Sequence, residues 1–221
     1  MELFHVLNRG VEKRNIVMDD KDRLRFVQGL YLYNDENLLD RNTRRFSKEK
    51  AISTVRKKLV NLHAFCLMDN HYHLLLSPVD ADMENLSAFM RKLNMGYAKY
   101  FNEKYRRVGA LWQGKYKKIY IARDSHFLHI PYYIHLNPLD YKFYEWRSGE
   151  ISNTLDPISF LKKYKWSSFL DYFGTKNYPS LLTTDVLKNM LGTQEEQIAT
   201  IKSIISNPDK TNFSEIIELS D

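Results

Sequence analysis

Two apolar runs separated by one polar dipeptide constrain most strongly what this chain of 221 residues can fold into. The runs lie in the segment LHAFCLMDNHYHLLLSPV, residues 62–79, with Asp69-Asn70 between them. Asp and Asn side chains satisfy the backbone of tight turns, and two short apolar runs joined by such a turn are typical of a β-hairpin. The segment therefore predicts an antiparallel pair of strands.

The clearest helix of the sequence follows the hairpin. Between residues 83 and 105, apolar and aromatic side chains recur every three or four positions, as on one buried helix face: Leu86, Phe89, Met90, Leu93, Tyr97, Tyr100, Phe101 and Tyr105. Other expected elements are a strand at 4–8, a helix capped by Asp19 or Asp20, a strand at 111–122, a helix from Asp124 or Ser125 to Asn137, and short helices at 184–191 and 193–205.

The chain length suits one domain, or one domain with a small appendage. From about residue 153 the pattern changes to an aromatic segment and then to the two short helices. We therefore expect a first unit at residues 1–150, and an aromatic segment with a small helical tail at residues 151–221. Residues 34–58 are highly charged and are interpreted as an insertion, either a mobile excursion or an exposed helix with a solvated surface.

Composition restricts the compartment and the partners. The net charge of +6 favours an anionic partner, such as nucleic acid or a membrane surface, without choosing between them. A single cysteine, Cys66, excludes an intrachain disulfide and a cysteine-rich zinc site. The chain has no run of about 20 apolar residues and no signal peptide at its N-terminus. We therefore expect a cytoplasmic protein without a membrane partner.

The hairpin carries two histidines, His71 and His73, two positions apart in a predicted strand. Their side chains leave the same face and can present two imidazole nitrogens to one metal ion. From the spacing alone, a pair of ordinary, partly buried histidines is the more frequent case. A divalent ion also needs a further ligand and open positions for substrate oxygens. Asn137 is a candidate, since an amide oxygen suits magnesium or manganese, although a helix C-cap before Pro138 explains Asn137 as well.

Basic residues are spread over the chain in positions suited to contacting phosphates. In the segment GALWQGKYKK, basic, aromatic and glycine residues are interleaved, which favours a nucleic-acid-binding loop, although core packing is the more frequent role of each aromatic residue taken singly. The candidate DNA-binding residues are Arg9, Arg14, Arg91, Lys92, Arg106, Arg107, Trp112, Gln113, Lys115, Lys117 and Lys118.

Four segments occur in an order that resembles a known family. They are HVLNRG, CLMDNHYHLLL, LNMGYAKYFNEKYRRVGALWQGKYK and YYIHLNPL, and WSSFLDYFG follows them. Over roughly residues 1–174 the chain resembles the REP-associated tyrosine transposases and related single-strand insertion-sequence transposases of the HUH endonuclease superfamily. The resemblance implies an α+β, ferredoxin-like (RRM-like) antiparallel sheet with helices on one face, to which the C-terminal helical appendage is added.

The resemblance also implies roles for individual residues. His71 and His73 would bind a divalent metal, Mg²⁺ or Mn²⁺, with Asn137 as third ligand, and Tyr133 would be the nucleophile. Residues four apart on a helix share a face, which agrees with Tyr133 and Asn137 acting together. Pro131 departs from a regular helix and predicts a kink or a restart there. Adjacent Tyr132 would point about 100° away, so only one tyrosine should face the metal.

The expected function is metal-dependent cleavage and strand transfer of single-stranded DNA through a 5′-phosphotyrosine, at sites flanked by hairpins. The resemblance favours a monomer acting in cis over a homodimer whose tyrosine serves the partner's histidine pair, with the protein associated with the nucleoid when bound to DNA. Three alternatives stay open: a DNA-binding protein that has lost catalysis, an RNA-directed binding module on the same scaffold, and a metal-dependent hydrolase without a covalent step.

Overall fold

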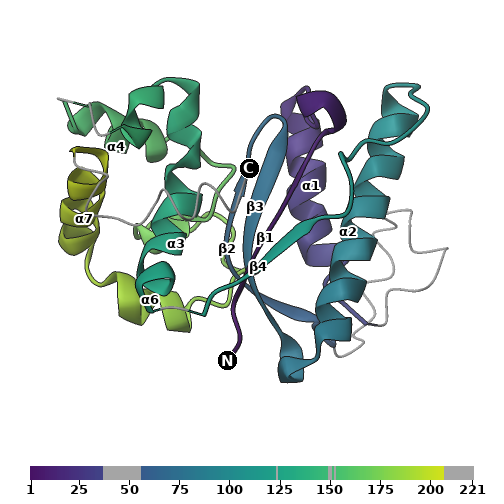
Figure 1. Ribbon diagram of the computed structural model, residues 1–221, viewed down its shortest axis with the longest axis horizontal. Helices are drawn as coiled ribbons and strands as arrows, with labels where there is room; N and C mark the ends of the chain where they lie inside the picture. The colour runs from purple at the N-terminus through teal and green to yellow at the C-terminus, as the bar shows by residue number, and fades with distance from the viewer. Residues whose placement is uncertain (37–55, 123, 149–150, 152, 207–221) are drawn as a thin grey trace.

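The structure is a computed structural model that describes residues 1–36, 56–122, 124–148, 151 and 153–206, with the side chains of 124–126 left out. The predicted insertion at 34–58 therefore lies mostly outside the described residues. The first six main elements form a β-α-β-β-α-β sequence (Figure 1): β1 (Phe4–Arg9), α1 (Asp20–Leu32), β2 (Val60–Leu67), β3 (His71–Pro78), α2 (Met83–Lys104) and β4 (Lys117–Tyr120).

The described strands form one four-stranded sheet in the order β2-β3-β1-β4. Every neighbouring pair is antiparallel, and β1 lies between β3 and β4. This order and the β-α-β-β-α-β sequence define the ferredoxin-like fold. The predicted α+β fold class is confirmed, and so is the hairpin, because β2 and β3 are joined across Asp69-Asn70.

Helices α1 and α2 cover one face of the sheet because each presents an apolar stripe to it. Phe26 of α1 meets Tyr97 of α2 edge to face at a centroid distance of 5.1 Å, and the Phe26 ring centroid lies 5.0 Å from that of Tyr72 of β3. The Asp19 side chain caps α1 by accepting a hydrogen bond from the Asp22 N–H, as expected. Members of the predicted α2 stripe, such as Phe89, are fully buried.

The opposite face of the sheet is covered as well, so the expectation of helices on one face holds only for α1 and α2. Helix α3 (Asp124–Leu136) packs on β2 and β3, and the short helix η4 (Asn137–Tyr141) continues from it. Figure 1 shows the sheet between α1 and α2 on one side and α3 on the other. Helix α3 runs through Pro131 instead of restarting there.

The C-terminal region packs into the same hydrophobic core as the sheet. The N–H of Leu67 donates to the carbonyl of Trp166 at 3.0 Å, and Thr183 donates to Leu62 at 2.8 Å, so both segments line the outer edge of β2. One core cluster extends from Leu3 to Ile205. The remaining elements are η1 (Val11–Lys13), η3 (Val79–Ala81), η5 (Tyr144–Arg147), α4 (Leu155–Leu161), α5 (Phe169–Tyr172), α6 (Asp185–Leu191) and α7 (Gln194–Ser206).

The strand predicted at 111–122 is shorter, since β4 covers only Lys117–Tyr120. Before it, Trp112 forms an isolated bridge with Gly10, and the N–H of Gln113 donates to the carbonyl of Arg9. Residues 113–116 then leave the ladder.

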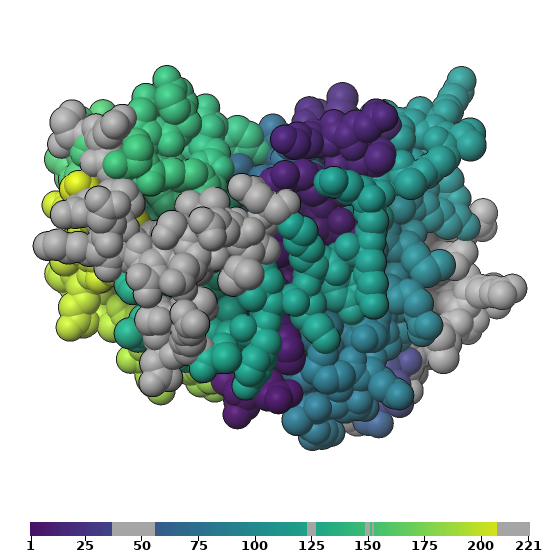
Figure 2. Space-filling view, viewed as in Figure 1, coloured from purple at the N-terminus to yellow at the C-terminus, as the bar shows by residue number. Residues whose placement is uncertain are grey.

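Figure 2 shows the purple N-terminal residues between the teal α2 side and the green C-terminal side. Within the described ranges, no helix is long and apolar enough to cross a bilayer.

Candidate functional site

The histidine pair lies at the centre of the sheet, on the face that α3 covers. Because His71 pairs with Arg9 and His73 with Leu7, the alternating side chains of β1 and β3 place both histidines on the same sheet face as His5, with His73 beside it. The His71 and His73 ring centroids are 4.9 Å apart with perpendicular planes, and the His5 ring stacks on His73 at 5.1 Å. The structure therefore gathers three imidazoles where the sequence indicated two.

Hydrogen bonds orient both rings of the pair. Nδ1 of His71 lies 2.6 Å from Oδ1 of Asn70, and Nδ1 of His73 lies 2.8 Å from Nε2 of His5. An amide oxygen only accepts, so Nδ1 of His71 carries a proton and its Nε2 keeps a lone pair. If His73 likewise donates to His5, its Nε2 is also left as a lone-pair donor. Such an outer partner is what fixes a metal-binding histidine.

Burial keeps these imidazoles neutral. Desolvation lowers the pKa of His71 to about 4, and the Arg9 charge acts in the same direction. Desolvation also lowers the pKa of His5 to about 3 and the pKa of His73 well below its ordinary value, with further lowering from His71 and His5. A neutral imidazole has the free nitrogen that binds a metal. The three rings are therefore uncharged near pH 7.

Helix α3 brings one of its two adjacent tyrosines to the histidines. The ring of Tyr133 meets His73 edge to face at 5.5 Å and His5 at 5.8 Å. Tyr132 points elsewhere, since its hydroxyl is hydrogen-bonded to Thr200 of α7. Desolvation at that place raises the pKa of Tyr132. The structure thus separates the two tyrosines that the sequence left adjacent, and Tyr133 faces the histidines.

Asn137 follows one turn after Tyr133 and lies against His71. Its Nδ2 donates to the carbonyl of Tyr133 at 2.7 Å, so the residue does serve the helix end. The Asn137 side chain also contacts His71, where it acts to raise the pKa of that ring against the larger effect of burial. The helix-capping role and the position beside the histidine pair therefore coexist, as the sequence allowed.

Arg147 of η5 closes the cluster from the side of η4. Its guanidinium donates to Oδ1 of Asn137 at 3.2 Å and to Oδ2 of Asp140 at 2.7 Å. It lies 5.6 Å from the centroid of the Tyr133 ring and is hydrogen-bonded to the Tyr133 side chain, which together with Asp140 raises the pKa of Arg147. A fixed positive charge therefore lies beside the phenol oxygen.

These donors suit a divalent cation that keeps open positions. Among the described residues, no group of three or more His, Cys, Asp or Glu side chains is arranged to hold a metal. The candidate donors at this site are Nε2 of His71, an imidazole nitrogen of His73, and Oδ1 of Asn137, which accepts a hydrogen bond from Arg147. An amide oxygen suits Mg²⁺ or Mn²⁺, and imidazole nitrogens bind several divalent ions, so these side chains are candidate ligands of a divalent cation.

The predicted DNA-binding residues divide between the two sheet faces. The strand register puts Arg9 and Lys117 on the histidine face. Arg9 pairs with His71, and Leu7 pairs with His73 on one side and with Lys117 on the other. Lys118 points to the other face and lies 5.3 Å from the Phe4 ring centroid. Gln113 and Lys115 are exposed in the loop before β4.

The other candidates lie on α2 or beside it. Arg91 is exposed in the middle of α2, whereas Nζ of Lys92 donates to the carbonyl of Asp35. Arg106 and Arg107 form the turn after the helix. Trp112 has a structural role: its Nε1 donates to the carbonyl of Asn94 at 2.9 Å, and its ring packs on Tyr72. The structure thus does not unite these residues into one patch with the histidine pair.

Four residues of the site escaped the sequence reasoning: His5, Asn70, Asp140 and Arg147. His5 stands in the segment HVLNRG, which was recognised, but only the pairing of β1 with β3 brings it to His73. Asn70 was interpreted solely as a turn residue. Nothing in the local sequence around Asp140 and Arg147 distinguishes them from surface charges, because their partners are set by the turn between η4 and η5.

One comparison with known proteins found a matching family model. The model of the family described as "Transposase IS200 like" matches residues 31–137, a segment that contains both histidines and Tyr133 and ends at Asn137. The match confirms the resemblance to the single-strand insertion-sequence transposases. A search of curated proteins found no match. Among solved structures, a REP-associated tyrosine transposase bound to a REP hairpin is similar, with a TM-score of 0.46, 15% identity, and coverage of 84% of this chain and 86% of that chain.

Proposed function

We propose that this protein cleaves and rejoins single-stranded DNA through a covalent bond to Tyr133. The observation that carries the proposal is the position of Tyr133, which lies 5.5 Å from the His73 ring within one chain, with the Arg147 guanidinium beside it. A hydroxyl nucleophile next to a pair of neutral imidazoles and a fixed cation is an arrangement for attack on a phosphodiester. The match to the IS200-like transposases supports the same chemistry.

His71, His73 and Asn137 would hold the divalent ion, Mg²⁺ or Mn²⁺. When bound, such an ion supplies polarisation of a non-bridging phosphate oxygen and orientation of the scissile bond. Asn70 holds His71 with its Nε2 lone pair available, and His5 does the same for His73 if His73 Nδ1 is the donor of their hydrogen bond. The chain would therefore bring two nitrogen donors and one amide oxygen to the cation beside the substrate phosphate.

The reaction forms one bond and breaks one. The phenol oxygen of Tyr133 attacks phosphorus and loses its proton, and the bond from phosphorus to the 3′-oxygen breaks. The products are a 5′-phosphotyrosine and a free 3′-hydroxyl. Arg147 stabilises negative charge on the phenol oxygen, since a guanidinium interacts strongly with a developing anion. Attack of another 3′-hydroxyl on the phosphotyrosine reverses the step and joins strands without ATP.

The substrate of the proposal is single-stranded DNA flanked by a hairpin. The solved protein of similar structure is described as bound to a REP hairpin, and Arg9 and Lys117 provide positive charge on the same sheet face as the histidines. We further infer a monomer acting in cis in the cytoplasm, at the nucleoid when DNA is bound, because one chain contains both the tyrosine and the histidine pair.

The test is to incubate the protein with labelled single-stranded hairpin DNA and Mg²⁺ or Mn²⁺ and to look for a covalent adduct on denaturing gels. We expect an adduct with the natural chain and none with Tyr133→Phe. Tyr132→Phe is the matched control, since Tyr132 is the adjacent tyrosine but points to α7. It should form the adduct at nearly the natural rate.

Other outcomes discriminate between the alternatives. An adduct that survives Tyr133→Phe and disappears with Tyr132→Phe would overturn the assignment of the nucleophile. Cleavage without an adduct would indicate the metal-dependent hydrolase. If the protein binds DNA but cleaves it with none of the divalent ions tried, it is a binding protein that has lost catalysis. Preference for an RNA hairpin would indicate the RNA-directed module.

A further inference from the structure

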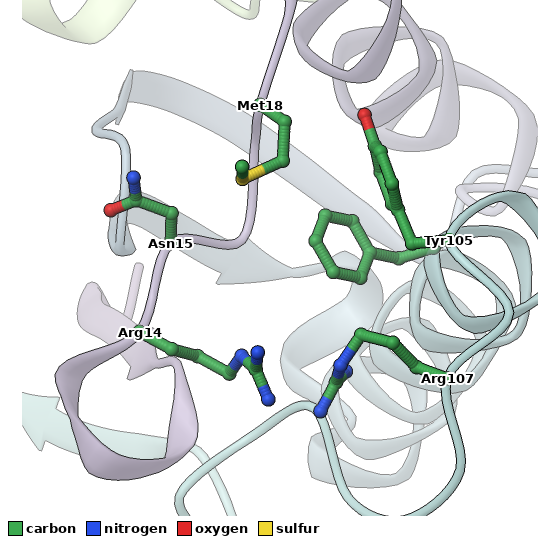
Figure 3. Close-up of a pocket in the computed structure, with 6 residues that line it drawn as sticks. Arg14, Asn15, Met18, Tyr105 and Arg107 are labelled. Carbon is green, nitrogen blue, oxygen red and sulfur yellow. The ribbon is translucent and has the colours of Figure 1, made fainter.

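A cavity of about 320 Å³ lies away from the histidine pair, at the end of α2. Its lining residues come from the loop after β1 and from the last turn of α2 and the segment that follows: Arg14, Asn15, Met18, Phe101, Tyr105 and Arg107. Figure 3 shows the side chains of Arg14 and Arg107 extending toward each other from opposite sides of this space. Ligand cavities of proteins begin at about this volume.

Two like charges face each other in this cavity. The proximity of Arg14 acts together with desolvation to lower the pKa of Arg107. Among the ion pairs of the described residues, none provides a carboxylate to either guanidinium. Converging guanidinium groups without a carboxylate are stabilised by an anion placed between them, and the planar donors of arginine match phosphate oxygens.

Arg107 is held in this position before any ligand arrives. Its Nη1 donates to Oδ1 of Asn102 at 2.8 Å, and its backbone N–H donates to the carbonyl of Asn102 at 2.8 Å. The preceding residue, Arg106, has a φ of 49°, a left-handed conformation that turns the chain back after α2. Preorganisation of this kind lowers the entropic cost of binding.

The loop that carries Arg14 is also fixed. Gly10 approaches the carbonyl of Arg14 so closely that a Cβ at position 10 would collide with that oxygen. The Ile16 N–H donates to the carbonyl of Asp69 at 2.7 Å, and the Gly10 N–H donates to the carbonyl of Asn70 at 2.8 Å. The cavity is therefore tied to the turn whose Asn70 side chain orients His71.

Aromatic rings form the other wall of the cavity. The ring of Phe101 packs on Tyr105 at a centroid distance of 4.6 Å, and the Tyr105 hydroxyl donates to Oδ2 of buried Asp22, which fixes the ring. Met18 adds an exposed apolar side chain. An anion site with an aromatic wall suits a nucleotide, since every base can stack on an aromatic face.

The geometry points to a nucleotide subsite for the DNA strand, with one phosphate between Arg14 and Arg107 and the attached unstacked base against Tyr105 and Met18, behind which Phe101 is buried. This inference rests on the proposed function, and it adds a second anchoring point outside the histidine site. We assign the nucleotide to a DNA strand rather than to a free mononucleotide, because the Arg14 loop is hydrogen-bonded to the turn that leads directly into His71.

The test measures binding of a fluorescent single-stranded oligonucleotide by anisotropy over a range of salt concentrations, with Tyr133→Phe as the background so that no cleavage occurs. We expect Arg14→Gln and Arg107→Gln each to weaken binding about tenfold, as for the loss of a charge-assisted hydrogen bond. The slope of log affinity against log salt should fall by about 0.7 for each arginine. The double variant should lose less than the product of the two effects, because both arginines hold one phosphate.

Lys188→Gln is the matched control, because it removes one positive charge from the exposed face of α6, on the other side of the sheet. A loss with this control as large as with the arginine variants would show a general effect of charge and overturn the subsite. Unchanged binding in both arginine variants would overturn it as well. Circular dichroism and thermal unfolding check that the variants fold.

Free dAMP and inorganic phosphate distinguish the source of the ligand. If they bind in an arginine-dependent way while oligonucleotide binding does not depend on the arginines, the assignment to a DNA strand is wrong. The proposed function fails separately, through the absence of a Tyr133-dependent adduct at saturating DNA. If DNA binding depends on the two arginines but no adduct forms, the subsite is supported and the proposed function is overturned. If an adduct forms but DNA binding does not depend on the arginines, the proposed function is supported and the subsite is overturned.

Discussion

At the scale of single residues, the hydrogen-bond partners of the histidine pair decide which nitrogen of each ring is available. Asn70 holds Nδ1 of His71, and His5 holds Nδ1 of His73. A ring that loses such a partner can rotate or change tautomer, and it then presents a protonated nitrogen to the cation. His5 is therefore a positioning residue of the proposed site, although the family segment HVLNRG that contains it was given no role at the site.

This role predicts a difference between two variants of His5. His5→Leu removes the partner of His73 and should weaken Mn²⁺ binding about 10- to 100-fold, the usual effect of deleting an outer partner of a metal ligand. His5→Gln keeps a hydrogen-bonding group of similar reach and should stay within a few-fold of the natural chain. Titration calorimetry with Mn²⁺ measures both affinities, and equal binding by the natural chain and His5→Leu would remove the role of His5.

At the scale of elements, one buried carboxylate joins α1 to α2. Asp22 of α1 is fully buried, and its oxygens accept hydrogen bonds from Tyr100, Tyr105 and Lys104, the last at 2.6 Å. Desolvation raises the pKa of Asp22, but these hydrogen bonds together outweigh it, and the net pKa is lowered. The charged form of Asp22 therefore stabilises the packing of the two helices.

Asp22→Asn should lower the free energy of unfolding by about 3 kcal/mol at pH 7, the lower end of the range for breaking a buried pair, because Lys104 is partly exposed. Exposed Asp20, which pairs with Arg23 at 3.2 Å, gives a control: Asp20→Asn should cost about 0–1 kcal/mol. Because folding lowers the Asp22 pKa, its contribution is complete above pH 3.8 and is lost as the pH falls through the lower folded value. In urea unfolding, the free energies of unfolding of the natural chain and of Asp22→Asn should therefore approach each other as the pH falls from 7 to 3. A difference between these two proteins that does not change with pH would contradict this.

At the scale of the whole molecule, the fold brings Tyr133, the proposed nucleophile, and the histidine pair of one chain together. Tyr133 lies on α3, while His73 lies on β3, and the packing of α3 on β2 and β3 places the rings 5.5 Å apart. Assembly with a second copy is not needed to complete the site. This arrangement favours catalysis in cis.

Catalysis in cis predicts the behaviour of mixed variants. Tyr133→Phe and His73→Ala should each abolish the DNA adduct, and a mixture of the two proteins should not restore it. A site shared between copies would instead combine the intact tyrosine of one chain with the intact histidines of the other. Adduct formation in the mixture, measured on denaturing gels, would therefore contradict the arrangement in cis.

Buried histidines also make the whole molecule sensitive to acid. Desolvation lowers the pKa of His5 and of His135 to about 3 each, whereas both titrate near 6.5 when unfolded. The stability that they contribute is thus complete above pH 6.5 and falls as the pH drops from 6.5 toward 3. For each of the two histidines, the free energy of unfolding should fall by ~2 kcal/mol between pH 7.5 and pH 5, since each pH unit below 6.5 corresponds to about 1.4 kcal/mol.

His135→Gln tests this sensitivity away from the proposed metal site. Nε2 of His135 lies 2.8 Å from Oγ of Ser168, and the ring packs on Phe169 and Tyr172, so glutamine retains a hydrogen-bonding group there. Denaturant unfolding at several pH values should show that the variant loses ~2 kcal/mol less than the natural chain between pH 7.5 and pH 5. Parallel pH profiles of the two proteins would mean that His135 does not take part.

The sequence by itself determined the elements whose cause is local. The apolar periodicity of α2, the Asp19 cap of α1 and the Asp69-Asn70 turn each act within a few residues, and the structure contains all three. The alternation of side chains along a strand likewise places His71 and His73 on one face. The family segments then pointed to Tyr133 and Asn137, which no periodicity distinguishes from other buried residues.

Only the tertiary structure decided how these elements meet. Strand register places His5 at His73; the sequence does not specify register, because a strand pattern reads the same for every partner. The direction of α3 separates Tyr133 from Tyr132, and hydrogen bonds from β2 to residues 166–183 join the C-terminal region to the sheet. Arg14 and Arg107, 93 positions apart, share a cavity only because the β1 loop and the end of α2 lie side by side. Contacts over such separations depend on the whole chain, and no local pattern encodes them.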